Sequence, residues 1–383
     1  MTVTGPAGFR AAGVTAGLKA SGKPDVALVV NDGPRYDAAA VFTSNRVRAA
    51  PVQWCESIIG RGVISAVFLN SGGANACTGP GGYGDTADTA AHVGALLAVP
   101  AEQIAICSTG LIGERLPMDK IAAGVLASHA ALSATGGSDA AIAIMTTDSV
   151  PKNILIQGPG FTVGGMAKGA GMLAPGLATM LVVLTTDAEV GSADLDAALR
   201  AATRVTFDRV DSDGATSTND TVLLLASGAS GVRPPQPVLQ AVVTKACAGL
   251  AHQLIADAEG ATKEISIQVV HAATEDDAVE VGRAVARNNL VKTAFFGGDA
   301  NWGRILAAVG TTRAAFDPHQ IDVAINDVWI CRGGSVGDDR AGVDMSGREA
   351  KVTIDLHAGT EQARIVTNDL SHAYVHENSA YST

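Results

Sequence analysis

The chain has 383 residues, of which 47% are hydrophobic, 17% charged and only 4% aromatic. This length suggests two or three domains, or one large α/β unit, with a core built from Ala, Val, Leu and Ile. The formal net charge of −11 is spread along the chain without a basic cluster, which argues against nucleic acid or an anionic membrane as a partner.

The cysteines and the N-terminus indicate the compartment. The five cysteines form no CxxC pair and their number is odd, so we expect no disulfide framework and a reducing environment. The N-terminal MTVTGPAGFRAAG lacks the apolar segment of a signal peptide. No stretch approaches 18 uninterrupted apolar residues, so no transmembrane span is predicted. These features together predict a cytoplasmic protein.

Strands are predicted where short apolar runs recur, and helices where apolar residues return every three to four positions. Several strands are apolar on both faces, which is typical of layered α/β folds. The predicted strands cover 25–30, 38–43, 63–70, 103–108, 153–157, 179–186, 220–227, 265–270, 321–326, 351–356 and 362–367. The predicted helices cover 85–99, 118–132, 192–207, 234–259 and 275–289, with Asp85, Ser192 and Asp276 or Asp277 as their N-caps.

Glycine and proline mark the expected boundaries. Soft boundaries are predicted at GPGFTVGGMAKGA (158–170) and GVRPPQP (231–237), and an exposed insertion is predicted at 331–350. No internal repeat or low-complexity block interrupts the chain.

Several common motifs are absent or lack the necessary context. There is no GxxxxGK[ST] phosphate loop, no HExxH and no zinc-spaced cysteine or histidine cluster, so neither a metal nor a cofactor is predicted. Residues 333–337 match GxSxG, but the polar sequel DDRAG predicts an exposed loop rather than a nucleophile elbow. The glycine-rich 70–85 lies between a strand and a helix, where it could bind an anion, although its glycine spacing is not that of a dinucleotide site.

The stretch CSTGLIGERLPMDK (107–120) has more specific chemistry. A strand ends at Ser108, and Thr109 and Gly110 follow. A hydroxyl beside a glycine N–H can direct two hydrogen-bond donors at one point, which is what an oxyanion requires. The alternative is an ordinary turn at the end of a strand.

A threonine inside the pentad LATML (177–181) is the second candidate. Cleavage before Thr179 would free its α-amine, whose unperturbed pKa is about 8, next to its own Oγ. One residue would then hold both nucleophile and base. The glycine-rich 164–171 is expected to give the backbone room for this cleavage. The alternative is a threonine that only begins a strand.

Six blocks in order resemble one enzyme family: CSTGLIG (107–113), MAKGAGMLAPGLATML (166–181), DGATSTNDT (213–221), DAEGATK (257–263), GGDANWGRI (297–305) and DLSHAYVHENSAYST (369–383). Together they are similar to glutamate N-acetyltransferase, also called ornithine acetyltransferase, of arginine biosynthesis. The similarity runs from GFRAAG (8–13) to Thr383. Ala300 departs from the family pattern, which has proline there, and 331–350 is expected to be variable.

The resemblance implies a fold, a maturation step and a reaction. The fold would be an αββα-type sandwich with a smaller C-terminal α/β domain. Self-cleavage between Ala178 and Thr179 would give an α chain (1–178) and a β chain (179–383) that assemble as an α2β2 heterotetramer. The enzyme would move acetyl from N2-acetyl-L-ornithine to L-glutamate through an acetyl-threonine, and some members of the family also accept acetyl-CoA as a substrate.

The resemblance also assigns roles to single residues. Thr179 is the nucleophile, and Thr109 and Gly110 form the oxyanion hole. The implied substrate contacts are Thr146 (with Thr147 as the weaker alternative), Lys168, Thr179, Glu259, Asn378 and Thr383.

Two other classes of function stay open at the level of sequence. A self-cleaving N-terminal-nucleophile aminopeptidase or amidohydrolase would share Thr179 but pass the acyl group to water. A non-catalytic binding or assembly protein would use Thr179 only structurally.

Overall fold

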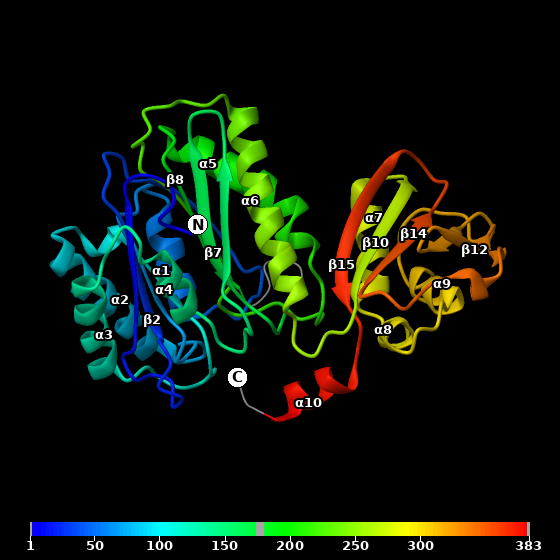
Figure 1. Ribbon diagram of the computed structural model, residues 1–383, viewed down its shortest axis with the longest axis horizontal. Helices are drawn as coiled ribbons and strands as arrows, with labels where there is room; N and C mark the ends of the chain where they lie inside the picture. The colour runs from blue at the N-terminus through cyan, green and yellow to red at the C-terminus, as the bar shows by residue number, and fades with distance from the viewer. Residues whose placement is uncertain (1, 174–179, 381–383) are drawn as a thin grey trace. The chain divides into compact units, whose positions relative to one another are not determined.

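The computed structural model describes residues 2–173 and 180–380. The chain divides into two compact units (Figure 1). The first consists mainly of Met1–Asp208 and Ala215–Leu254, and the second of Arg209–Gly214 and Ile255–Ser382. Each unit has its own hydrophobic core, as expected for separate domains.

The first unit begins with a four-stranded sheet of order β1-β2-β4-β5. Its strands are β1 (Phe9–Val14), β2 (Val26–Asn31), β4 (Ala66–Asn70) and β5 (Ile104–Ser108). Only β4 and β5 run parallel, so the loops after Asn70 and Ser108 leave the same edge of the sheet. The helices that pack around this sheet are α1 (Ala50–Ile59), α2 (Gly79–Leu97), α3 (Met118–Ala130) and α4 (Gly137–Ala143).

A second sheet of the same unit has the order β3-β9-β8-β7-β6. Its strands are β3 (Asp37–Phe42), β9 (Thr221–Ala226), β8 (Leu181–Thr186), β7 (Thr162–Lys168) and β6 (Lys152–Gln157). β8 and β9 are parallel and the other pairs antiparallel. Helix α5 (Ser192–Val205) packs against β3, and α6 (Gln236–Ala256) is bonded to β6 through Gln253 and Asn153.

The two sheets face each other. Leu181 and Val183 of β8 share one buried cluster with Leu28 of β2 and Phe68 of β4. Val182, the neighbour between Leu181 and Val183, is also buried, on the opposite face of β8 where helices cover the sheet. The first unit is therefore the predicted αββα sandwich.

The second unit is the predicted smaller α/β domain. Its six-stranded sheet has the order β13-β12-β11-β14-β10-β15, and α7 packs on β10 and β15. The strands are β10 (Glu264–Ala272), β11 (Asp322–Ile325), β12 (Val328–Arg332), β13 (Ser335–Val336), β14 (Glu349–Asp355) and β15 (Glu361–Asn368). The helices are α7 (Glu275–Ala286), α8 (Asn289–Phe296), α9 (Trp302–Val309) and α10 (His372–Ala380). Short 3₁₀ turns at Ala101–Gln103, Phe207–Arg209 and Arg340–Gly342 complete the chain.

The predicted N-caps are wrong. Asp85 lies inside α2, which begins after Thr78. Ser192 is the first residue of α5, after Gly191. The cap of α7 is Thr274, whose side chain accepts the N–H of Asp277.

The soft boundary predicted at 158–170 is also wrong, because β7 occupies most of it. Its glycines serve close packing rather than freedom: a Cβ on Gly164 would lie 2.5 Å from Thr2 O. The expected loose run 164–171 is therefore a paired strand as far as Lys168. The stretch 231–237 runs into α6, whose first residue is Gln236, and the units separate near residue 254.

Helix α6 is, among the described helices, the one that is long and apolar enough to cross a membrane by length and composition alone. Half of its apolar window is buried, and a Cβ on Gly249 would lie 2.9 Å from Ile154 of β6. A helix buried against a sheet has the same composition as a membrane span, so this composition fits its place in the sandwich.

Candidate active site

Two parallel strands place the first site loops side by side. β4 ends at Asn70 and β5 at Ser108, opposite each other in register, and Ser108 Oγ donates to Asn70 Oδ1 at 2.6 Å. The N–H of Thr109 donates to Asn70 O, and the N–H of Gly73 donates to Thr109 O, both at 3.0 Å. These bonds fix the backbone of the predicted oxyanion turn.

Gly110 occupies a backbone conformation that other residues rarely adopt. Its φ is +130°, and a Cβ there would lie 2.7 Å from Gly73 N, so only glycine fits. Among residues 2–173 and 180–380, none accepts a hydrogen bond from the Gly110 N–H. This donor is therefore available to a ligand, as an oxyanion hole requires.

Lys168 joins this turn from the second sheet. It ends β7, is 2% exposed, and its Nζ donates to Thr109 Oγ1 at 3.1 Å. Because that bond occupies a lone pair, the Thr109 hydroxyl hydrogen can still donate, and the nearby cation makes it a stronger donor. The structure thus brings together Thr109, Gly110 and Lys168, three residues that the sequence predicted.

A buried carboxylate holds the next part of the site. Asp148 Oδ1 accepts the N–H of Gly169 at 2.7 Å and Lys152 Nζ at 2.6 Å, and its Oδ2 accepts the N–H of Thr146 at 3.0 Å. Burial alone would raise the pKa of Asp148, but the ammonium groups of Lys168 and Lys152 outweigh it and lower that pKa. Asp148 therefore fixes the predicted contact Thr146 next to the end of β7.

The predicted nucleophile and cleavage partner, Thr179 and Ala178, lie outside the described residues. The chain is described again from Met180, whose N–H donates to Asp220 Oδ1 at 3.0 Å. Burial raises the pKa of the Asp220 carboxyl well above its ordinary value, against the opposing effect of that hydrogen bond. Leu181 follows opposite Lys168 in the β7–β8 register, so the start of β8 lies between Lys168 and Asp220.

Asn219 is a site residue that sequence reasoning did not single out. Its Nδ2 donates to Ser108 O at 2.8 Å and to Ala74 O at 2.6 Å, so it fastens the oxyanion turn to the loop before β9. A usable signal existed, since polar side chains directly before a fully buried strand must find hydrogen-bond partners. Asp148 was missed as well, because its bond to the Gly169 N–H joins residues 21 positions apart, which local spacing does not reveal.

Two of the remaining predicted contacts, Glu259 and Asn378, belong to the second unit. Glu259 is buried in the segment that follows α6 and precedes β10 in the sequence. Asn378 lies on α10, where its Nδ2 donates to Tyr374 O at 3.0 Å. Thr383 lies outside the described residues. The roles of these three positions stay predictions.

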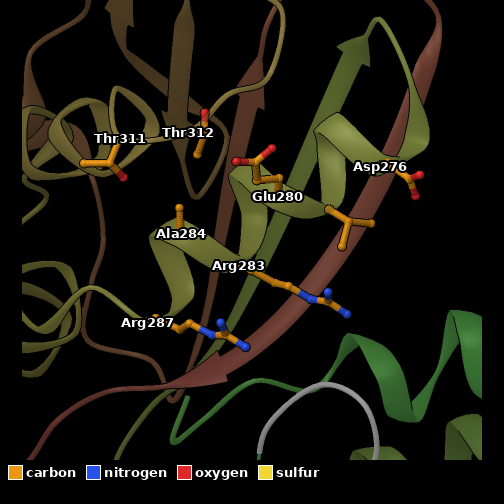
Figure 2. A pocket seen from close by; sticks show the side chains of 8 residues that line it. Asp276, Glu280, Arg283, Ala284, Arg287, Thr311 and Thr312 are labelled. Carbon is orange, nitrogen blue, oxygen red and sulfur yellow. The ribbon is translucent and has the colours of Figure 1, made fainter. Parts of the chain in front are cut away.

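A cavity and a cluster of ligating side chains lie in the second unit. The cavity of about 460 Å³ is lined by residues that include Glu280 and Arg283 of α7 and Arg287, the residue directly after that helix (Figure 2). Figure 2 shows the two arginines on one side of it, and Arg287 Nε is held by Asp211 at 2.7 Å. None of the residues that line this cavity was predicted as a site residue. Its lining residues are Asp276, Val279, Glu280, Arg283, Ala284, Arg287, Thr311 and Thr312.

Within the described part of the chain, one group has the side chains to ligate a metal: His271, Asp355 and His357. Their contacts, such as His271 Nδ1 to Asp355 Oδ2 at 2.8 Å, are already hydrogen bonds. The GxSxG serine, Ser335, lies in the exposed two-residue strand β13, directly after a turn at Gly333 and Gly334 and with no helix directly after it, so it lacks the strand–turn–helix context of a nucleophile elbow.

The chain is similar in sequence and in structure to known proteins. The sequence pattern of the ArgJ family matches residues 10–383. "Arginine biosynthesis bifunctional protein ArgJ" of Streptomyces avermitilis is 63% identical over 383 residues, and that of Thermobifida fusca 61% identical, each covering 100% of both chains. The crystal structure of ornithine acetyltransferase with ornithine from Mycobacterium tuberculosis is 52% identical over 47% of this chain and 96% of that chain, with a TM-score of 0.43.

Proposed function

The chain belongs to the ArgJ family, and from this premise we propose that it is the acetyltransferase of arginine biosynthesis that moves the acetyl group of N2-acetyl-L-ornithine to L-glutamate. The observation that carries the proposal is the 63% identity with a named ArgJ over the full length of both chains. The buried turn of Thr109 and Gly110 next to Lys168 supplies the donors that such chemistry needs.

We propose that the chain first cleaves itself between Ala178 and Thr179. Thr179 Oγ attacks the Ala178 carbonyl, the peptide nitrogen leaves as the α-amine of Thr179, and water hydrolyses the resulting ester. This frees the amine that acts as base for the same residue's Oγ. The products are an α chain of residues 1–178 and a β chain of residues 179–383.

The transfer then proceeds in two half-reactions. The α-amine of Thr179 takes the Oγ proton as Oγ bonds to the acetyl carbon, and the C–N bond to ornithine breaks with return of the proton to the leaving amine. Glutamate's amine then attacks the acetyl-threonine ester and releases Oγ. In both steps the negative oxygen is stabilised by the Thr109 hydroxyl and the Gly110 N–H, each typically worth about 3 kcal/mol.

The surroundings of the turn suit these steps. Lys168 is buried and touches Thr109 Oγ1, so it can balance the oxyanion's charge or bind a substrate carboxylate. Glu259 is assigned to the distal ammonium of ornithine. Thr146, Asn378 and Thr383 are the further proposed contacts. We also propose acetyl-CoA as an alternative acetyl donor, an α2β2 heterotetramer as the assembly and the cytoplasm as the location.

The test is a transfer assay with acetyl-labelled acetylornithine and glutamate. Wild-type protein should form labelled acetylglutamate, and denaturing electrophoresis should show two bands, one beginning Thr-Met-Leu-Val. Thr179→Ala should give one uncut band and no transfer, because it lacks the nucleophile. Met180→Leu, which changes the next side chain without removing the hydroxyl, is the matched control and should keep both properties.

Two outcomes would contradict the proposal. Active transferase with an unbroken chain would refute the maturation step. Release of free acetate without acetylglutamate would instead favour the N-terminal-nucleophile amidohydrolase.

A further inference from the structure

The loop before β2 is built around one buried carboxylate. Asp25 is fully buried, and it accepts the backbone N–H groups of Ala16 and Leu18 at 2.6 Å and of Lys19 at 3.1 Å. Lys120 fixes the same loop from α3 through a 2.7 Å bond to Gly17 O. Three amide groups that bind one carboxylate restrict the conformation of the loop. The backbone of Lys19 is therefore fixed in position.

The Lys19 side chain is fixed as well. Its Nζ donates to Pro24 O at 2.8 Å and to Met145 O at 2.7 Å. An ammonium group has three hydrogens, and in the described part of the structure these two acceptors account for two of them. The third can bind a ligand. Lys19 is half-buried, so its charge is neither free in solvent nor sealed in the core.

This ammonium group lies beside the candidate active site. Met145 O belongs to the residue directly before Thr146. On the other side, a Cβ on Gly72 would lie 2.2 Å from Leu18 Cβ, so the Lys19 loop touches the loop that pairs with Thr109. The charges of Lys168 and Asp148 are close enough to shift the pKa of Lys19. The bond to Met145 O and the approach of Leu18 to Gly72 therefore place Lys19 at the site.

Resting on the proposed function, we propose that Lys19 is a substrate-binding residue that receives the side-chain carboxylate of the acidic acceptor amino acid. The two substrates share an α-carboxylate, which Lys168 can bind next to the oxyanion turn. Only glutamate has a second carboxylate, and it needs a second cation. Lys19 supplies that cation, with its position set by Asp25 and Met145 and its third hydrogen available.

The electrostatics of Lys19 suit a site that alternates between two substrates. Burial lowers its pKa to about 8, with Lys168 and Lys23 lowering it further and Asp25 and Asp148 opposing. At this pKa the proton is lost at little cost near neutral pH. Lys19 can thus be charged when glutamate binds, and neutral when the ammonium of ornithine occupies the site.

The experiment compares Lys19→Met with Lys23→Met, an exposed lysine of the same loop. In ping-pong kinetics, kcat/KM for each substrate reports on its own half-reaction. Lys19→Met should lower kcat/KM for glutamate by roughly ten- to a hundredfold, the usual effect of losing a charged hydrogen bond. It should change kcat/KM for acetylornithine less than about threefold. Lys19→Arg should recover part of the loss, and Lys23→Met should match wild type.

If Lys19→Met only loosened the loop, transfer would be impaired with every substrate. Glutamine, the neutral counterpart of glutamate, is therefore tested as a second acceptor, because its use by the enzyme does not depend on a charge at residue 19. Wild type should prefer glutamate to glutamine, and Lys19→Met should lose most of that preference. Equal losses with glutamate, glutamine and acetylornithine, or an unchanged preference, would overturn the inference. If wild type itself transfers no acetyl group, the proposed function fails instead.

Discussion

At the scale of single residues, the site depends on buried charged groups that hydrogen-bond within the fold. Lys168, Asp148 and Asp220 are each at least nine-tenths buried, which is affordable only because each is bonded. Gly110 differs, because its N–H has no acceptor in the described part of the chain. An amide held rigidly and left unpaired is a pre-formed donor for an oxyanion.

Gly110→Ala tests that arrangement. Its Cβ would come within 2.7 Å of Gly73 N, so the turn must shift and the donor must move. We expect kcat to fall by roughly 10²–10³ with the protein still folded. The control is Gly113→Ala, because Gly113 also has positive φ but nothing within 4 Å of its Cβ position. Equal kcat values for the two variants would remove Gly110 from the oxyanion hole.

At the scale of elements, Asp148 joins the end of β7 to the turn that contains Thr146. Its oxygens accept the N–H groups of Gly169 and Thr146. It also forms an ion pair with Lys152, and both side chains of this pair are fully buried. Removing one partner of such a pair leaves an uncompensated charge in the core. The stability lost in this way is larger than the net stability that the intact pair contributes.

Asp148→Asn should therefore destabilise the protein by about 3 kcal/mol at neutral pH. Because the pKa of Asp148 is lowered in the folded state, its stabilising effect is present above the unfolded pKa of about 4 and is lost as pH falls through the folded pKa. The Tm difference from wild type should shrink at acid pH. Asp88→Asn, at an exposed position of α2, is the control, and a pH-independent Tm difference for Asp148→Asn would contradict this reading.

The strands and helices that the sequence predicted correctly are those with a clear pattern of apolar side chains. β2 and β8 were found because all their residues are buried and most of them are apolar. β7 was missed because Gly164 and Gly165 resemble a linker. Gly164 allows a close approach to the N-terminal segment and Gly165 to the side chain of Leu184, and neither contact can be read from the local sequence. α1 was missed although Pro51 in its first turn and Gly60 after its end are ordinary start and stop signals.

The site was predictable only in part for the same reason. Thr109 and Gly110 follow a strand that the pattern reveals, and Lys168 came from the family resemblance. Asn219 and Asp148 act through contacts between segments more than twenty residues apart. The spacing of residues within one segment cannot predict such contacts.

At the scale of the whole molecule, the proposed cleavage point does not coincide with a boundary between units. β7 ends before residue 178 and β8 begins after residue 179, and six residue pairs join them from Val163↔Thr186 to Lys168↔Leu181. The two proposed chains therefore share one sheet and one core.

The cleaved chains should accordingly stay together without a covalent link. Gel filtration in native buffer should elute both fragments in one peak, and denaturant should separate them only when the sheet unfolds. An uncut Thr179→Ala sample should elute with the same native size. Fragments that separate in native buffer would show that the β7–β8 pairing does not survive the cut.

The amide of Asn219 has a consequence for that divided molecule. Thr109 and Gly110 belong to the proposed α chain, whereas the side chain that braces Ser108 and Ala74 belongs to the β chain. A gene fragment encoding only the first polypeptide would supply both oxyanion donors but would lack the two hydrogen bonds that Asn219 gives to the backbone beside them. The order of events in biogenesis follows: the intact precursor has to fold before it divides, since catalytic geometry is assembled from both halves.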